Sequence, residues 1–461
     1  MLTPALTQEF KNIVGADNVF TDDADLMTYS YDAAVVKPVI PALVARPTDS
    51  EALGRVVALC GENGLPLTVR GAGTNLSGGT VPTSREGIVI LTNGLNRILE
   101  INEADMYAVV QPGVVTAKFA AAAEAKGLFY PPDPGSQAVS TLGGNVAENA
   151  GGLRGLKYGV TSNYVMGLKF FDTKGEIVKT GSKTVKCATG YNLTGLMVGS
   201  EGTLGVFDEI TLKLIPPPAH RKAMVAVFDE MIKASEAVAA IIAARIIPCT
   251  LEFMDNFTIR AVESYSHAGL PTDAAALLLI EVDGHPAMVE EDAVRVEEIC
   301  RRLNATDIRV ARDDAERDKV WAARRSALSA LAKLKPTLVL EDATVPRSRI
   351  PEMVQAMQDI AKKFRLEIGT FGHAGDGNLH PTILTDKRNT EEWTRVEAAI
   401  EAIFDKALAM GGTLSGEHGT GIAKSCFLEK ETSLATILYS RAVKAALDPK
   451  NILNPGKVIG G

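Results

Sequence analysis

The sequence predicts an α+β protein with two domains and a C-terminal segment, and three observations support this fold class. The chain has 461 residues, and at roughly 150 residues per domain this length suggests two or three domains. Residues 65–215 combine many glycines with short strand-like runs, whereas residues 224–409 alternate longer helical and strand-like runs. Pro216-Pro217-Pro218 separates the two parts and cannot continue a sheet ladder. We therefore expect domains at 1–218 and 219–415, followed by a segment at 416–461.

The first part is expected to begin its regular structure with a helix at 50–64. Ser50 is a candidate N-cap, apolar residues repeat on one face, and Gly64 ends the run. A strand at 65–70 follows. The other expected strands are 87–91 and 211–215, and residues 170–178 form a hairpin that turns at Lys174-Gly175.

The second part alternates strands and helices. The expected strands are 224–228, 250–253, 276–282, 307–311 and 337–340. The expected helices are 229–245, 287–303, 313–334, 348–364 and 390–409. Strands and helices interleaved on this scale predict an α+β domain with helices on one face of its sheet.

Composition excludes several classes of protein. A formal net charge of -8 with no Lys/Arg cluster argues against nucleic-acid binding. No apolar run approaches the roughly 18 residues that a membrane span needs. The first 12 residues lack the pattern of a signal or transit peptide. The five cysteines are scattered and odd in number, which indicates a reducing compartment. We expect a cytoplasmic protein.

A glycine-rich loop at 71–79 follows the strand at 65–70. Glycines there let backbone N–H groups turn toward an anion. The loop fails the GxGxxG dinucleotide fingerprint, because Leu76 stands where Gly or Ala is needed, and fails the P-loop pattern, because Gly79 replaces the Lys. A strand rather than a helix is expected after it. A glycine turn without a ligand is the alternative interpretation.

Two further segments, 131–152 and 199–205, are also dense in Gly and Asn and lack hydrophobic periodicity. Such backbone is a poor core element and indicates close approach to a ligand. Three separated glycine systems in one domain exceed what turns alone require.

Three of the six histidines fall in two polar, glycine-dense segments, 371–380 and 415–421. A regular strand would point His373 and His380 to opposite faces, but a turn at Asp376-Gly377 could bring both rings together. Two imidazoles and a carboxylate suit zinc or another divalent ion with one position open to substrate. Histidines satisfied by loop contacts are the alternative.

These segments resemble the flavin-binding domain of the vanillyl-alcohol oxidase superfamily, in which a β-loop-β turn holds the pyrophosphate of FAD. With the histidine segments, the chain is similar over nearly its whole length to the glycolate oxidase flavoprotein subunits and FAD-linked D-lactate dehydrogenases. The resemblance implies an FAD-binding domain, a ferredoxin-like α+β cap, and a C-terminal segment that returns to the FAD domain.

The resemblance also implies the residues that bind FAD. The pyrophosphate falls to Arg70, Gly71, Ala72, Gly73, Thr74, Asn75, Leu76 and Ser77. The flavin falls to Asp133, Gly143, Gly144, Asn145 and Asn149, with Gly202 and Val206 on the isoalloxazine side. Asn454 lies in the returning segment, where a simple turn before Pro455 is the alternative. No histidine precedes His220, so FAD is expected to be non-covalent unless Cys60 or Cys187 is used.

The same resemblance implies His373, His380 and Glu417 as metal ligands and His418 as the catalytic base. Arg324 matches a Trp-x-x-Arg pattern and would bind the substrate carboxylate through two parallel hydrogen bonds. A solvated helical arginine is the alternative for Arg324.

The implied activity is oxidation of a D-2-hydroxy acid, of the D-lactate or glycolate class, to the 2-oxo acid by hydride transfer to FAD. D-2-hydroxyglutarate and D-malate would need another cation, for which Lys333 and Lys335 are candidates. A flavoprotein subunit that works only with partner subunits, an oxidase that uses oxygen, and a non-enzymatic FAD-binding protein are the alternatives. The electron acceptor and the choice of homodimer or other assembly stay open.

Overall fold

The computed structural model describes residues 2–460 and divides them into two compact units. The first unit contains the chain up to Gly151, then Val160–Pro217, and the chain from Glu417 onward. The second unit contains Gly152–Gly159 and Pro218–Gly416. The division expected from the sequence missed that residues 152–159 pack with the second unit.

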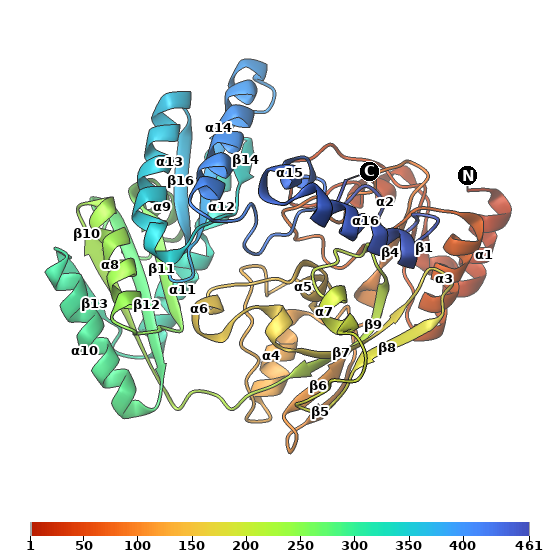
Figure 1. The fold of residues 1–461 in the computed structure, drawn as a ribbon, viewed down its shortest axis with the longest axis horizontal. Coiled ribbons are helices and arrows are strands. Elements are labelled where there is room, and N and C mark those ends of the chain that lie inside the picture. Colours follow the sequence, from red (N-terminus) through yellow and green to blue (C-terminus); the bar gives the residue numbers. More distant parts are fainter. Residues whose placement is uncertain (1, 461) are drawn as a thin grey trace. The chain divides into compact units, whose positions relative to one another are not determined.

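Two sheets form the first unit, with strand orders β1-β2-β4-β3 and β5-β6-β9-β7-β8 (Figure 1). Their strands are β1 Val19–Phe20, β2 Leu43–Ala45, β3 Leu67–Arg70, β4 Ile88–Leu91, β5 Ile98–Asn102, β6 Tyr107–Val110, β7 Val165–Phe171, β8 Ile177–Gly181 and β9 Val206–Lys213. Because β3 and β4 pair in parallel, the glycine loop connects two strands without a helix.

The helices of the first unit include several that the sequence did not predict. All the described α-helices of this unit are α1 Pro4–Val14, α2 Asp23–Thr28, α3 Ser50–Asn63, α4 Thr116–Glu124, α5 Leu142–Glu148, α7 Leu193–Met197, α15 Leu428–Glu431 and α16 Leu434–Leu447. The expected helix at 50–64 is present as α3, but its N-cap is Asp49, which accepts the Ala52 N–H, and not Ser50. Gly64 ends α3 with a φ of +63°.

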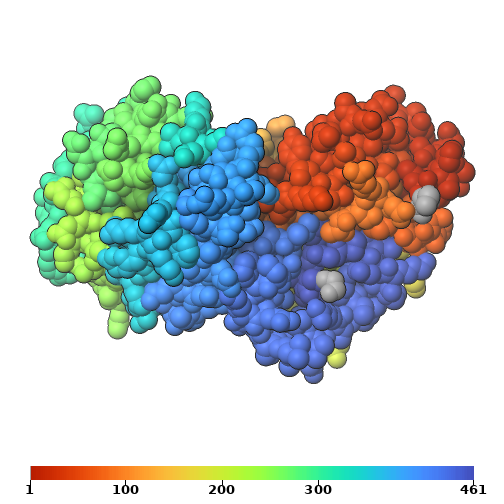
Figure 2. All heavy atoms as spheres, turned by 90° about the horizontal axis from the view of Figure 1, so that it is seen from above, coloured from red at the N-terminus to blue at the C-terminus, as the bar shows by residue number. Residues whose placement is uncertain are grey.

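The C-terminal segment packs on the N-terminal sheet within this unit. The Leu67 N–H donates to Ile452 O and the Asn454 N–H donates to Leu67 O, so the tail extends the ladder beside β3. Figure 2 shows this segment, in blue, against the orange and red N-terminal residues. Strand β3 is therefore held on one side by β4 and on the other by residues almost 390 positions later in the chain.

One antiparallel sheet organises the second unit, with strand order β13-β10-β12-β11-β16-β17-β14 and β15 paired to β17. The strands are β10 His220–Phe228, β11 Thr250–Asp255, β12 Ala276–Gly284, β13 Asp307–Val310, β14 Thr337–Leu340, β15 Ala343–Thr344, β16 Glu367–His373 and β17 Asn378–Thr385. The helices are α6 Gly155–Tyr158, α8 Met231–Ala243, α9 Asn256–Ser266, α10 Pro286–Arg302, α11 Asp314–Arg325, α12 Ala327–Ala332, α13 Ile350–Phe364 and α14 Thr390–Ala409.

Helices cover both faces of this sheet, so the expectation of helices on one face was wrong. Leu277 and Leu279 of β12 pack with residues of α9, α11 and α12 in one apolar cluster. Leu278 and Ile280 point the other way, because side chains alternate along a strand, and are fully buried. Helices α8 and α10 contact the same strands. The continuous apolar run of β12 is what a strand covered on both faces requires.

The helix expected at 313–334 is two helices, α11 and α12, which are separated at Ser326. No described helix has both the length and the apolar character needed to cross a membrane.

Asp255 ends β11 and caps α9, and its titration gives a test of the second unit. Its carboxylate accepts the N–H groups of Thr258 and Thr370, at 2.8 and 2.7 Å. Burial raises the pKa of this carboxyl from 3.8 to about 6. Because the folded chain binds this proton more tightly than the unfolded chain, the group lowers stability as pH rises from about 4 to about 6.

We expect the Asp255→Asn variant to gain stability relative to the wild type over that interval, by up to about 3 kcal/mol. Urea unfolding of both proteins at pH 4 and pH 7 measures the change. A stability difference that stays constant with pH would contradict the raised pKa.

Candidate functional site

The loop after β3 offers a row of unused backbone donors. Within the described chain we find no acceptor for the amide N–H groups of residues 72–78. Gly73 and Gly78 adopt φ values of +70° and +77°, which other residues rarely reach. Unsatisfied amides in such a turn form an anion-binding concavity. The loop therefore fits a pyrophosphate.

Gly73 tests this cradle. A Cβ at this position would lie 2.2 Å from the Arg70 guanidinium, which donates to Tyr31 O at 2.6 Å. We expect Gly73→Ala to raise the dissociation constant for FAD by about tenfold, since a left-handed alanine alone costs about 1–2 kcal/mol. Fluorescence titration of the apoprotein with FAD measures it. Gly135→Ala is the matched control, because nothing lies within 4 Å of a Cβ there; equal losses would argue against the cradle.

The second glycine system surrounds the short helix α5. Gly143 lies against Pro112, because a Cβ there would be 2.5 Å from the Pro112 Cβ. The buried Asn145 side chain donates to Thr116 Oγ1 at 2.8 Å, and Asn149 ends α5 with a φ of +54°. The other predicted flavin contacts, Asp133, Gly144, Gly202 and Val206, belong to the same unit, and Val206 opens β9.

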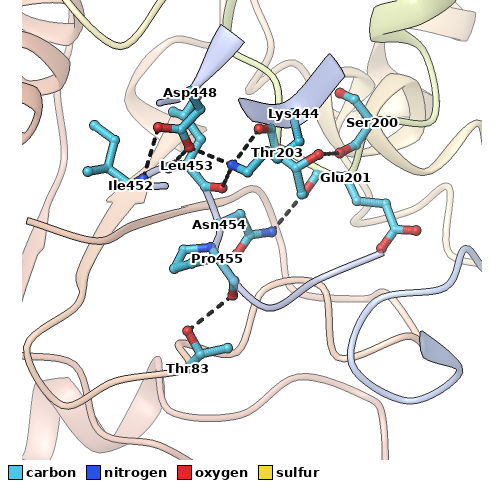
Figure 3. Close-up of polar contacts among 10 residues, drawn as sticks. All are labelled: Thr83, Ser200, Glu201, Thr203, Lys444, Asp448, Ile452, Leu453, Asn454 and Pro455. Carbon is cyan, nitrogen blue, oxygen red and sulfur yellow. Dashed lines mark hydrogen bonds and ion pairs between the residues drawn. The ribbon is translucent and has the colours of Figure 1, made fainter. Parts of the chain in front are cut away.

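Asn454 holds three parts of the first unit together. Its amide nitrogen donates to Gly79 O at 2.9 Å. It also donates to Glu201 O at 2.7 Å (Figure 3). Its carbonyl oxygen accepts from Thr68 Oγ1 and from Lys457 Nζ. The side chain is buried, and its hydrogen bonds connect β3, the glycine loop and the 199–205 turn. Asn454 therefore does more than form the turn before Pro455 that was the alternative interpretation of the sequence, because its side chain links these three segments.

Lys444 of α16 fixes the same region from the other side. It donates to Thr203 O at 2.9 Å and to Leu453 O at 2.7 Å, and it pairs with Asp448 at 2.5 Å (Figure 3). The Asp448 carboxylate also accepts the N–H groups of Ile452 and Leu453. The tail is thus anchored before it reaches Asn454.

The segment that carries His418 is bound to the glycine loop within the first unit. Glu201 accepts the N–H groups of Thr420 and Gly421, both at 2.7 Å. Ser77 O accepts the N–H groups of Ile422 and Ala423, both at 3.0 Å. The predicted catalytic base therefore precedes a stretch of chain that is fixed on the predicted cofactor loop.

Three buried ionisable side chains lie in this part of the first unit, and they were not predicted from the sequence. Burial raises the pKa of Glu148 well above its ordinary value, and the neighbouring Glu201 adds to the effect. Burial also raises the pKa of Glu201, although the Thr420 and Gly421 N–H groups oppose the shift. Lys457 donates to Val81 O at 2.7 Å, and burial lowers its pKa to about 8.

Cys60 is unsuited to a covalent flavin link. It lies in the apolar core beneath the first sheet, and burial raises the pKa of its thiol to about 12. The thiolate is the nucleophile, so this cysteine is inert. Cys187 is exposed and unpaired.

In the second unit, the hairpin of β16 and β17 brings two predicted ligands together. Phe371 pairs with His380 across the hairpin, and the rings of His373 and His380 lie 5.1 Å apart at 89°. Both histidines are buried. The turn expected at Asp376-Gly377 is present, but the flanking residues are strands, which the sequence did not predict.

Glu252 of β11 contacts two predicted site residues. One carboxylate oxygen lies 2.7 Å from His373 Nδ1, and the other lies 2.5 Å from Arg324 Nη2. Burial opposes ionisation of Glu252, but the charges of Arg324 and His373 outweigh it and lower its pKa. The sequence signal was a carboxylate within a strand-like apolar run, and it was overlooked.

Arg324 is buried, in contrast to the solvated helical arginine that was the alternative. It is 5% exposed, its guanidinium carbon lies 4.7 Å from the Phe371 ring centroid, and its Nε has no hydrogen-bond partner among the described residues. A buried donor without a partner indicates a missing acceptor. Arg325, the next residue, is exposed.

The remaining predicted residues have other surroundings. Gly416 ends the second unit against Thr344 and Asn378, and Glu417 and His418 follow it as the first residues of the C-terminal part of the first unit. Within that unit, Glu417 packs on Gly151.

The two lysines considered for a distal carboxylate are occupied at the surface. Lys333 lies 4.3 Å from the Tyr265 ring, and Lys335 pairs with Glu367 at 3.3 Å.

Comparisons with known proteins agree with this geometry. Residues 217–458 match the family described as FAD linked oxidases, C-terminal domain, and residues 41–181 match the FAD binding domain family. The chain is 49% identical to the glycolate oxidase subunit GlcD of Bacillus subtilis, over 99% of this chain and 97% of that protein. It is 33% identical to the D-lactate dehydrogenase of Anaerostipes hadrus, over 99% and 98%.

The chain belongs to the FAD-linked oxidase family. The resemblance inferred from the sequence is confirmed. The fold is similar to that of p-cresol methylhydroxylase, with a TM-score of 0.80, 18% identity, and coverage of 98% of this chain and 96% of that one. This likeness, together with the match to the FAD binding domain family, confirms the predicted fold class, a vanillyl-alcohol-oxidase-type FAD-binding domain with a mixed helix and sheet architecture.

The residues present fit the cofactor of this family. The unsatisfied amides at 72–78 offer donors for a pyrophosphate, and the first unit contains the other predicted FAD contacts. A metal fits the donor types in the second unit, because two adjacent imidazoles suit zinc and other divalent ions.

Proposed function

We propose that the chain oxidises a D-2-hydroxy acid, of the D-lactate or glycolate class, to the 2-oxo acid. The observation that carries this proposal is the buried Arg324, whose Nε has no hydrogen-bond partner among the described residues. Glu252 contacts both Arg324 and His373, and the His373 ring lies next to that of His380. A cationic fork recognises a carboxylate, and imidazoles recognise the adjacent hydroxyl through a metal. The named relatives, a glycolate oxidase subunit and a D-lactate dehydrogenase, support this substrate class.

Each residue has one role in this proposal. Arg324 binds the substrate carboxylate, and His418 accepts the proton of the 2-hydroxyl group as the C2 hydrogen leaves. FAD, bound without a covalent link, supplies the hydride acceptor. A divalent ion held by His373, His380 and Glu417 would lower the pKa of the substrate hydroxyl. The fixed 420–423 segment keeps the His418 loop from shifting during the proton transfer.

A small substrate is favoured over D-2-hydroxyglutarate or D-malate. The two candidate lysines for a second carboxylate are engaged with Tyr265 and Glu367 at the surface. A further cation of the second unit, Lys157, is already paired with Asp283.

We further propose that the chain works in the cytoplasm with partner subunits. The Bacillus subtilis relative is named as a subunit, and the five cysteines are unpaired. Assaying the isolated chain with an artificial electron acceptor, and separately with oxygen, distinguishes the cases. Turnover with neither acceptor supports a need for partners; turnover with oxygen identifies an oxidase.

Anaerobic titration of the flavin tests the substrate class. Bleaching of the flavin absorbance by D-lactate or glycolate, but not by L-lactate, supports the proposal. Reduction only by D-2-hydroxyglutarate or D-malate would transfer the assignment to the larger acids. No reduction by any 2-hydroxy acid would contradict the proposed enzyme.

A further inference from the structure

Glu252 occupies a special position among the carboxylates of the second unit. Along β11 and β12, three buried acidic residues share one sheet face: Glu252, Glu281 and Asp283. Glu281 accepts the Trp321 indole N–H at 2.6 Å, and Asp283 accepts the Tyr158 hydroxyl at 2.6 Å. Both therefore serve partners that have no role in the proposed chemistry, whereas Glu252 contacts a predicted metal ligand and the predicted carboxylate-binding arginine.

The contact between Glu252 and His373 bears on the tautomer of the imidazole ring. A carboxylate oxygen lies 2.7 Å from His373 Nδ1, and this geometry favours the tautomer in which Nδ1 carries the proton and donates it to Glu252. The lone pair then resides on Nε2, the form in which a histidine binds a metal. Carboxylates that hold metal-binding histidines in this way also fix the orientation of the ring.

The second oxygen of Glu252 restrains Arg324. The 2.5 Å contact to Nη2 and the stacking of the guanidinium on Phe371 leave Nε as the unsatisfied donor. One buried carboxylate thus ties the orientation of the arginine to that of the histidine. Rotation of either partner would break the hydrogen bond to His373 or the buried ion pair with Arg324.

We propose that Glu252 is a positioning residue that fixes the tautomer of His373 for metal binding and the guanidinium of Arg324 for the substrate carboxylate. This inference deepens the proposed function and rests on it for the identity of the substrate. It assigns to a residue of β11 a role that it performs through His373 and Arg324. Its loss should weaken metal binding even when FAD binding and folding are intact.

The experiment compares Glu252→Gln and Glu252→Asp with Glu281→Gln in the FAD-loaded chain. Glu281→Gln is the matched control, because it removes a buried charge from the same face of the same sheet. We expect Glu252→Gln to raise the dissociation constant for Zn²⁺, measured by calorimetry, by about 10- to 100-fold. Glu252→Asp should recover part of this loss, and Glu281→Gln should bind zinc as the wild type does.

A second readout does not depend on metal or activity. NMR of the chain labelled with ¹⁵N-histidine should show the Nδ1–H tautomer for His373 in the wild type and a mixture in Glu252→Gln, with His373→Gln used to assign the signal. Unchanged zinc affinity and tautomer in Glu252→Gln would overturn the proposal, as would an equal loss in Glu281→Gln. If the wild type binds no zinc, the metal part of the proposed function fails, while the tautomer still decides the role of Glu252.

Discussion

His418→Ala is expected to slow flavin reduction by a D-2-hydroxy acid by orders of magnitude while FAD stays bound. A general base contributes about 10²- to 10⁴-fold to a proton-transfer step, so the loss should fall in this range. FAD retention is expected because the backbone N–H groups of Thr420, Gly421, Ile422 and Ala423 bind this segment to Glu201 and Ser77 O, and the substitution leaves them in place. Anaerobic stopped-flow absorbance measures the reduction rate, and the ratio of flavin to protein measures occupancy.

His220→Ala provides the control for this experiment. His220 begins β10 and is exposed, and its Nε2 lies 3.6 Å from a carboxylate oxygen of Glu290. Its removal should leave the rate unchanged. Wild-type reduction by His418→Ala would remove the assignment of the base, whereas loss of FAD from this variant would show that the imidazole has a structural role.

The glycine-rich loop at 71–79 was predicted from the sequence to connect two strands, and it connects β3 and β4. Gly73 and Gly78 adopt conformations that other residues avoid, so a dense run of glycines predicts a loop with this kind of backbone. The histidine hairpin was harder to predict. Gly, Asn and Pro are weak strand formers, and β16 and β17, which contain them, become strands through pairing and burial in the sheet.

The residues that were missed share one property: they are charged groups inside apolar or glycine-rich runs. Glu252 lies in β11 among buried apolar residues, and Glu201 lies in a glycine turn. Local patterns gave no partner for either carboxylate. Their partners, Arg324 and the Thr420-Gly421 amides, are separated from them by 72 and about 220 positions, and only the folded chain brings them together.

Loss of the Arg324 side chain is also expected to lower the stability of the fold, apart from any effect on substrate binding. Replacing it by Leu would leave the Glu252 carboxylate buried without its cation. Breaking a buried ion pair from one side costs about 3–5 kcal/mol. We expect Arg324→Leu to unfold at a clearly lower urea concentration than the wild type, and the Arg324→Leu/Glu252→Leu double variant to recover much of the loss. No recovery in the double variant would argue against a buried pair.

Arg324→Lys is expected to lower kcat/KM for D-lactate by about 10- to 100-fold, mainly through a higher KM. Lysine keeps the positive charge, and so it can still neutralise Glu252, but it loses the planar fork that holds a carboxylate through two hydrogen bonds and the stacking on Phe371. Arg325→Lys is the matched control, since Arg325 is the adjacent residue on the exposed side of α11. A selective rise in KM in Arg324→Lys would tie substrate binding to the buried guanidinium. Equal kinetics in Arg324→Lys and the wild type would contradict the proposal that Arg324 holds the substrate carboxylate through two hydrogen bonds.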